Sequence, residues 1–261
     1  MTSSLQPQPV STDMPNSACF GDCADCGRRH ALPIGNARGL ALDLLHDIES
    51  TGRLDFDVPE HEADPRYSLD NVIRPGHGNM FGILECESAE GETVVLRAFS
   101  SLRHGIRRID GWVLPLLSAS LYDETILPAQ DEIKRLTTEL NAQPVGSKEH
   151  QRLQDERRNV SRDLWEQMCA AYRFRNFRGG ERSLADAVVP GTPITGGMGE
   201  CCAPKLLNHA AIAGLRPLSM AEFYWGSGPQ HGSRISGEFY ESCEARCQPI
   251  LGYMLCGLDE S

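Results

Sequence analysis

Four cysteines near the C-terminus constrain the fold more than any other feature of the chain. Cys201 and Cys202 follow a glycine-rich turn, and Cys243 and Cys247 come after an intervening apolar segment. Cys243 and Cys247 are four residues apart, so they share one face if they open a helix. Unpaired N–H groups at a helix start stabilise thiolates. We therefore interpret the two pairs as one metal site, which requires two distant helix starts to lie together.

Zinc suits this set of donors. The first 18 residues lack the basic and apolar regions of a signal peptide, so we expect a cytoplasmic protein, in which ten cysteines favour metal binding over disulfides. The predicted Zn²⁺ ligands are Cys202, Cys243 and Cys247, with Cys201 or Cys26 as a spare or fourth ligand, and the sequence does not decide between Cys201 and Cys202. Three protein ligands with a water are typical of catalytic zinc, and a fourth protein ligand makes a structural site. The alternatives are buried thiols without metal and redox chemistry at Cys201–Cys202.

A second group of possible ligands lies near the N-terminus. Cys19, Cys23, Cys26 and His30 occur within twelve residues, and the spacings from Cys23 to Cys26 and from Cys26 to His30 are compatible with zinc on a short loop. Cys26 and His30 either form a small zinc knuckle or donate ligands to the later site. The alternative is that some of them are ordinary loop residues. Residues 1–18 are expected to form a disordered lead.

Hydrophobic periodicity predicts the core elements. Apolar residues at helical spacing indicate helices, and two apolar runs around an Ala-Glu-Gly turn indicate a β-hairpin. The predicted order is helix, two strands, helix, strand and helix, over residues 35–51, 80–86, 93–99, 200–213, 215–225 and 243–255.

A long charged segment interrupts this core. Residues 129–172 carry apolar side chains at helical spacing on both sides of a Pro-Val-Gly break, which predicts two antiparallel helices. We take 129–183 as an inserted helical hairpin between two halves of one core, 19–128 and 184–261. A length of 261 residues suits one large domain with such an insertion.

The end of the insertion alternates arginines with aromatic rings. Arg173, Arg175 and Arg178 are interleaved with Phe174 and Phe177. Guanidinium groups neutralise phosphates and aromatic rings stack on bases, so this pattern predicts a contact with single-stranded RNA. The net charge of −11 favours the alternative, in which a basic helix end packs on the acidic remainder of the protein.

The element order and the placement of the thiols resemble the core of the zinc-dependent nucleoside and nucleic-acid deaminases. The resemblance implies an α/β (α+β) fold, a helix–sheet–helix sandwich with an inserted helical hairpin. It also implies one zinc ligand and a catalytic glutamate at the second core helix, and two cysteines at the third. In that family zinc activates a water that attacks the base, and the glutamate moves the proton.

The sequence departs from the deaminase motifs in two places. The family has His or Cys, any residue and then Glu, whereas residues 202–204 read Cys-Ala-Pro, and the second cysteine pair has three intervening residues instead of two. We therefore expect Glu200 to serve as the proton shuttle, with Glu222 or Glu238 as substitutes. Lys205 is the second expected catalytic residue, because its ammonium group can stabilise negative charge.

Several longer strings resemble a different family. MFGIL, LRAFSS, NFRG, TGGMGECCAPKLLNHAA, LRPLSMAEFYWG and GEFYESCEARCQPILGYML are similar to the N-terminal extension of some large bacterial RluA-type pseudouridine synthases, over roughly residues 26–258. The catalytic Arg-Leu-Asp motif of those synthases occurs here at Arg53–Asp55, before the predicted hairpin and without the Thr-Ser-Gly pattern that follows it there. The resemblance implies the extension standing alone, which does not isomerise uridine.

Two functions follow from these patterns. The preferred hypothesis is a zinc-dependent, deaminase-like hydrolase acting on a nucleobase, a nucleoside or an RNA base. The alternative is a non-catalytic accessory module, stabilised by a closed zinc site, that binds RNA or a pseudouridine synthase. Neither predicts a membrane partner, because no apolar run approaches the roughly 20 residues that span a bilayer.

Overall fold

The computed structural model describes residues 17–73, 77–100, 106, 108–226 and 234–258. It has a mixed helix and sheet fold, which confirms the predicted α+β class. The chain divides into two compact units. The first unit comprises Met1–Leu116, Phe174–Arg182 and Asp186–Ser261, and the second comprises Leu117–Arg173 and Ser183–Ala185.

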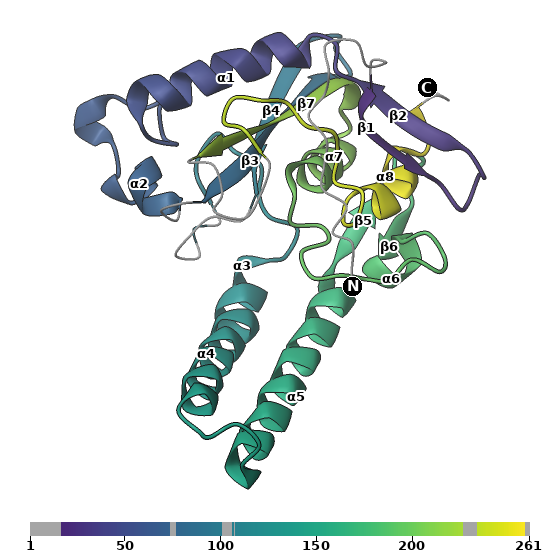
Figure 1. Ribbon diagram of the computed structural model, residues 1–261. Helices are drawn as coiled ribbons and strands as arrows, with labels where there is room; N and C mark the ends of the chain where they lie inside the picture. Colours follow the sequence, from purple (N-terminus) through teal and green to yellow (C-terminus); the bar gives the residue numbers. More distant parts are fainter. Residues whose placement is uncertain (1–16, 74–76, 101–105, 107, 227–233, 259–261) are drawn as a thin grey trace. The chain divides into compact units, whose positions relative to one another are not determined.

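A three-stranded antiparallel sheet in the order β4-β3-β7 forms the centre of the first unit (Figure 1). β3 (Gly78–Glu87) and β4 (Thr93–Phe99) form the hairpin that the sequence predicts, and β7 (Arg216–Gly226) pairs with the other edge of β3. The register places Gly82 opposite Glu222. This pairing decides which side chains of β7 meet the thiols.

Helices cover both faces of this sheet (Figure 1). α1 (Ala37–Thr51) buries its apolar stripe against one face, in a core that includes Phe81 and Phe223. α7 (Cys202–Ala213) packs on the opposite face, since strand side chains alternate and Gly82 leaves room there for Cys202 and Leu206. The predicted helices at 35–51 and 200–213 are therefore confirmed.

The third core helix is shorter than predicted. α8 spans Gln248–Leu255, so the expected helix at 243–255 is wrong over its first five residues. Pro249 lies in the first turn of α8, where its fixed φ and missing N–H suit a helix start. Cys243 lies in the preceding turn, and the backbone N–H of Cys247 donates to the Cys243 carbonyl at 2.9 Å. That single turn still holds both thiols at one place.

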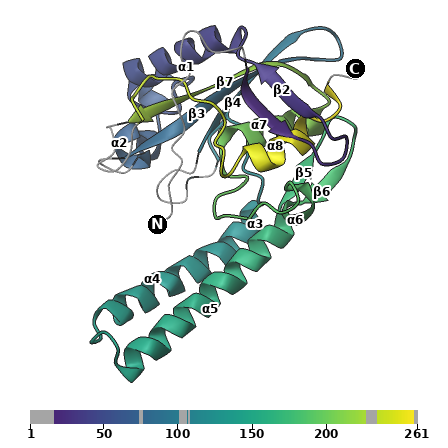
Figure 2. The same cartoon turned by 45° about the vertical axis from the view of Figure 1, so that its right-hand side comes forward.

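Cys23 and Cys26 lie in a short loop, as expected, and this loop joins the two strands of a β-hairpin that contain Cys19 and His30. β1 (Ser17–Asp22) pairs with β2 (Arg29–Pro33) and packs against α8 (Figures 1 and 2). Ser17 and Ala18 belong to β1, which corrects the end of the predicted disordered lead, and residues 1–16 lie outside the described residues. Short elements complete the first unit and its connections: Glu60–Glu62, Pro65–Tyr67, α2 (Leu69–Val72), β5 (Arg173–Arg175), β6 (Glu181–Ser183) and α6 (Leu184–Ala187).

The second unit is an antiparallel helical hairpin. α4 (Leu127–Asn141) and α5 (Lys148–Ala171) bury Leu136, Leu140 and Leu153 between them, and the Ser147 hydroxyl caps α5 by accepting from the His150 N–H. A short α3 (Ala119–Leu121) and a short π-helix (Tyr122–Ile126) precede α4. The unit therefore begins about a dozen residues before the expected boundary at 129, and it leaves Phe174–Arg182 to the first unit.

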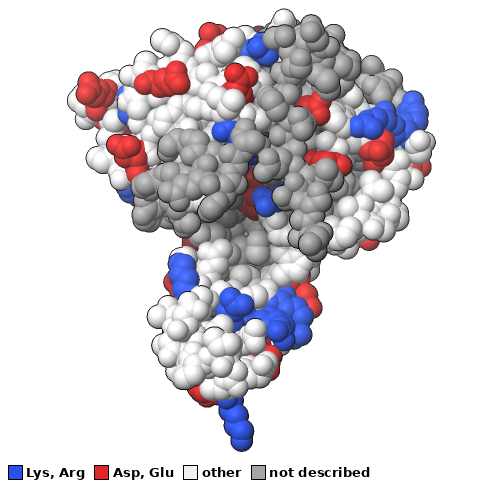
Figure 3. Space-filling model, in the orientation of Figure 1, with Lys and Arg blue, Asp and Glu red and all other residues white. Residues whose placement is uncertain are grey.

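Charged side chains on this hairpin pair mainly within their own helix. Arg135 contacts Glu132 and Glu139, and Arg152 contacts Glu149 and Glu156, all at helical spacing. Figure 3 shows basic and acidic side chains next to one another on the hairpin. Exposed pairs of this kind stabilise a helix by a few tenths of a kcal/mol each. None of the described helices combines the length and apolar character needed to cross a membrane.

The contact between β1 and α8 leaves no room for a side chain on α8 at Gly252. An added Cβ there would overlap the carbonyl of Asp22 and lie 2.6 Å from the Cys23 backbone nitrogen. We expect Gly252→Ala to lower the free energy of unfolding in urea by about 1–3 kcal/mol, as overpacking does. Gly39→Ala is the control, because its Cβ meets nothing within 4 Å, and it should stabilise α1 by about 0.5–1 kcal/mol. Equal unfolding midpoints for both variants would contradict this packing.

Candidate metal and thiol sites

Glu222 lies among several cysteines on the α7 face of the sheet. Its side chain projects from β7 beside Gly82, and its Oε1 accepts the backbone N–H of Ala203 at 3.1 Å. Glu222 as a whole residue is only 5% exposed. Burial raises the pKa of Glu222 to about 7, although the Ala203 N–H favours the charged form. Glu222 therefore exchanges a proton near neutral pH.

Three predicted ligands lie where α7 and α8 begin, although their sulfur atoms do not all fall within 4.8 Å of one another. Cys201 is the N-cap residue of α7, and Cys247 is the N-cap residue of α8. Hydrogen bonding to Cys201 and Cys243, together with burial, raises the pKa of Cys247 well above its usual range. The Cys247 thiol and the backbone N–H groups of Arg246 and Ala245 lower the pKa of Cys243 to about 5. Cys243 is thus a thiolate at neutral pH, the form that binds zinc.

Cys202 has a different environment from Cys201. Its thiol is completely buried and donates to the Met80 carbonyl oxygen at 3.3 Å. Burial and the nearby Glu222 raise the pKa of Cys202 well above its usual range. Cys201 is half-buried and close enough to Cys247 to raise the pKa of that thiol, so it is better placed to serve as the third ligand.

The two residues expected to be catalytic, Glu200 and Lys205, flank Cys201 and Cys202 in the sequence. Glu200 is half-buried in the turn before α7, where its N–H donates to the Gly197 carbonyl. Lys205 is buried on α7, and its ammonium group donates to the Phe99 carbonyl oxygen at 3.0 Å. Lys205 thus holds the end of β4 to α7. Catalytic roles for both residues stay predictions.

A second group of ligand atoms is tighter than the first. Cys23, Cys26, His30 and Cys256 each place one sulfur or nitrogen atom within 4.8 Å of all the others, and this is the only such group found among the described residues. The Cys26 sulfur lies 3.1 Å from His30 Nε2 and 3.8 Å from the Cys256 sulfur. Although desolvation acts against it, hydrogen bonds from the Arg28 backbone, His30 and Cys23 lower the pKa of Cys26 to about 6.

This grouping answers a question that the sequence left open. Cys26 and His30 belong to a site of their own with Cys23, and Cys256 completes it from the end of α8. The sequence analysis missed Cys256, which ends an apolar helix and has no second cysteine near it. Cys19, one of the four N-terminal candidates, is not part of this group. Burial and the charge of Glu222 raise the pKa of Cys19, so that β1 adds a further thiol to the Glu222 region.

The arginine and aromatic segment forms β5, β6 and the turn between them, not a basic helix end. Phe174 is completely buried, so its ring cannot stack on a base in this conformation. Arg175 pairs with Glu181 at 2.9 Å, and Arg173 donates to two nearby backbone carbonyls. These contacts favour the alternative of internal pairing. Half-buried Phe177 and exposed Arg178 leave RNA contact as a prediction.

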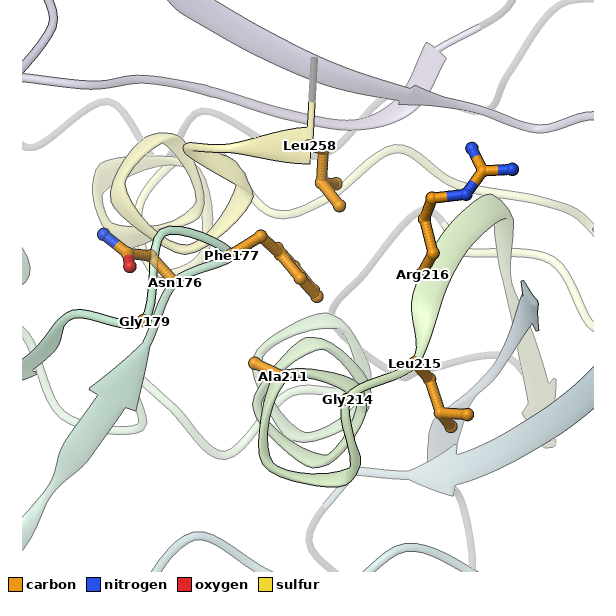
Figure 4. A pocket seen from close by; sticks show the side chains of 8 residues that line it. All are labelled: Asn176, Phe177, Gly179, Ala211, Gly214, Leu215, Arg216 and Leu258. Carbon is orange, nitrogen blue, oxygen red and sulfur yellow. The ribbon is translucent and has the colours of Figure 1, made fainter. Parts of the chain in front are cut away.

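Phe177 also lines an open pocket of about 320 Å³ at the C-terminal end of α7. Figure 4 shows Phe177 and Leu258 pointing toward one another across it. Its one charged lining residue, Arg216, pairs with Glu87 at 2.7 Å. The pocket lies at the opposite end of α7 from Cys201 and Cys202, so it is not part of the thiol site.

Comparisons of the chain with protein-family models, curated proteins and solved structures find no match.

The titration of Glu222 should be visible in the pH dependence of stability. Its folded pKa of about 7 exceeds the ordinary 4.5, so its protonated form stabilises the fold below pH 4.5 and this contribution is lost as the pH rises to 7. A shift of this size corresponds to about 3 kcal/mol.

We expect Glu222→Gln to remove most of that loss, because glutamine stays neutral and keeps the oxygen that accepts the Ala203 N–H. Urea unfolding at pH 5 and pH 8, on protein purified without added zinc, measures the change. Glu244→Gln, at an exposed site in the turn before α8, is the control and should leave the pH dependence unchanged. If the two variants behave alike, Glu222 does not titrate as described.

Proposed function

We propose that this chain is a zinc-dependent, deaminase-like hydrolase that acts on a nucleobase, a nucleoside or an RNA base. The observation that carries the proposal is the Glu222 carboxyl, buried beside the thiols at the start of α7 with a pKa near neutrality. Groups that titrate near the working pH are the efficient general acids and bases. A buried carboxyl beside metal-binding thiols is a typical functional arrangement.

The architecture supports the proposal. The sheet order β4-β3-β7, with α1 on one face and α7 on the other, agrees with the helix–sheet–helix core that the deaminase resemblance implies. In that resemblance the thiols stand at the starts of the second and third core helices, and here Cys201 and Cys247 are the N-cap residues of α7 and α8. This likeness rests on topology and thiol placement.

The position of Glu222 accounts for the missing glutamate of the helix motif. If Cys201 is the ligand on α7, the family's glutamate falls two residues later, at Ala203. Glu222 Oε1 lies 3.1 Å from the backbone nitrogen of that same residue. This contact supports Glu222, one of the two substitutes considered, as the proton shuttle in place of the helix glutamate of the family.

The donor types at this site fit zinc, and the three sulfur atoms would have to move closer together to share one ion. Cys243 carries a stabilised thiolate, and both Cys201 and Cys243 are near enough to raise the pKa of Cys247. These three residues would hold the ion, and bound Zn²⁺ supplies a water made nucleophilic near neutral pH. Oε1 accepts the Ala203 N–H, and Glu222 would accept a proton from a water bound at this site and return it to the departing amino group.

Ammonia release tests the proposal. Zinc-loaded protein is incubated with a panel of nucleosides and oligonucleotides, and Glu222→Gln is compared with Glu200→Gln. We expect the wild type to release ammonia from at least one substrate. Glu222→Gln should keep its zinc and lose at least about 10²-fold in rate, as expected for a general acid–base group.

Two outcomes would contradict the proposal. Zinc-loaded wild type that releases no ammonia would favour the accessory module that binds RNA or a pseudouridine synthase. Loss of turnover in Glu200→Gln, with Glu222→Gln fully active, would return the proton shuttle to Glu200. Glu244→Gln should behave as the wild type in both comparisons, because its side chain is exposed in the turn before α8.

A further inference from the structure

We propose that Cys23, Cys26, His30 and Cys256 hold a second Zn²⁺, in a closed structural site that fastens the β1–β2 hairpin to the C-terminal end of α8. The ion at this site takes no part in the proposed hydrolysis. The ion would hold together two segments that are distant in the sequence, since Cys26 and Cys256 are 230 residues apart.

The distances in this group match tetrahedral zinc. Two sulfur atoms bound to one tetrahedral Zn²⁺ at about 2.3 Å lie roughly 3.8 Å apart. The sulfur atoms of Cys26 and Cys256 are separated by 3.8 Å. All four ligand atoms fall within 4.8 Å of one another, so a single ion can reach each of them with small side-chain adjustments.

The identity of the donors selects the metal and the type of site. Three thiols and one imidazole are soft or intermediate ligands, which favour zinc over calcium or magnesium. Four protein ligands fill a tetrahedral shell and leave no position for water or substrate, which is typical of structural zinc. A disulfide does not explain the group, because it would leave His30 and one thiol without a role.

The backbone holds these ligands in place from both sides. In the β1–β2 turn, the Cys23 N–H donates to the Arg28 carbonyl, and Gly27 takes the positive φ of 68° that lets the chain turn between Cys26 and His30. At the end of α8, the Cys256 carbonyl accepts the Phe177 N–H at 3.0 Å. Both halves of the site are therefore positioned by contacts that do not depend on the ion.

A bound ion would also add to the stability of the β1–β2 hairpin. An isolated two-stranded hairpin is at best marginally stable in water. Among the described strands, β1 and β2 pair only with each other, with one further backbone bond from Ser242 to Ala18, and alternate residues of β2 are exposed. Their main packing partner is α8, as Figures 1 and 2 show. A metal that bridges the hairpin and α8 would stabilise this packing, because binding at such a site is coupled to folding.

Zinc counting on purified full-length variants tests this site. Cys26→Ser and Cys256→Ser should each lose one equivalent of zinc relative to the wild type. Cys169→Ser, in α5 and outside both thiol groups, should lose none. Cys26→His keeps four ligands at a half-buried position, so it should retain the full zinc content.

A spectroscopic readout covers the case in which the serine variants fail to fold. In the Co²⁺-substituted protein, Cys26→His replaces one thiolate by an imidazole, so the thiolate-to-cobalt charge-transfer band should weaken and the d–d bands should shift. An unchanged cobalt spectrum, unchanged zinc in both serine variants, or a disulfide among Cys23, Cys26 and Cys256 would overturn the proposal.

Zinc counting distinguishes a wrong assignment of one site from a wrong assignment of the other. Cys243→Ser should remove the zinc at the start of α8 and leave the equivalent bound by Cys23, Cys26, His30 and Cys256. A protein that holds one zinc, sensitive to Cys256→Ser and insensitive to Cys243→Ser, would support the structural site and contradict the metal centre of the proposed hydrolase. The reverse pattern would overturn the structural site alone.

Discussion

The hydrogen bond from the Ala203 N–H to Glu222 is the contact on which the arrangement of the candidate site depends. It joins the first turn of α7 to the middle of β7 and leaves a carboxyl buried on the α7 face of the sheet. Burial of a carboxyl without such a partner is costly, since the group would lose its hydration with no compensation. Gly82 makes the contact possible, because any side chain opposite Glu222 would displace Cys202.

The two sulfur-rich groups lie at different places in the fold. One group lies at the starts of α7 and α8 beside a titratable carboxyl and comprises Cys201, Cys243 and Cys247. The other lies where β1 and β2 meet the end of α8 and comprises Cys23, Cys26, His30 and Cys256. α8 contributes to both groups from its two ends. A chemical centre and a structural site would then share this short helix and hold separate ions at its two ends.

Much of the fold could be predicted from the sequence because it depends on local patterns. The periodicity of residues 37–51 and the two apolar runs around a glycine turn are enough to define α1 and the β3–β4 hairpin. The position of Glu222 was harder to predict, because it follows from the long-range register of β3 and β7. Cys256 was missed for a similar reason, since its three partners lie more than 220 residues away. The start of α8 was misplaced because its thiols were given more weight than Pro249.

A zinc-edge anomalous difference map from crystals of the zinc-loaded protein tests the central claim most directly. We predict two peaks, one within bonding distance of the Cys201, Cys243 and Cys247 sulfur atoms beside Glu222, and one surrounded by Cys23, Cys26, His30 and Cys256. The first should have three protein ligands and the second four. A map with no peak beside Glu222, or with four protein ligands closing that site, would contradict the proposed hydrolytic centre.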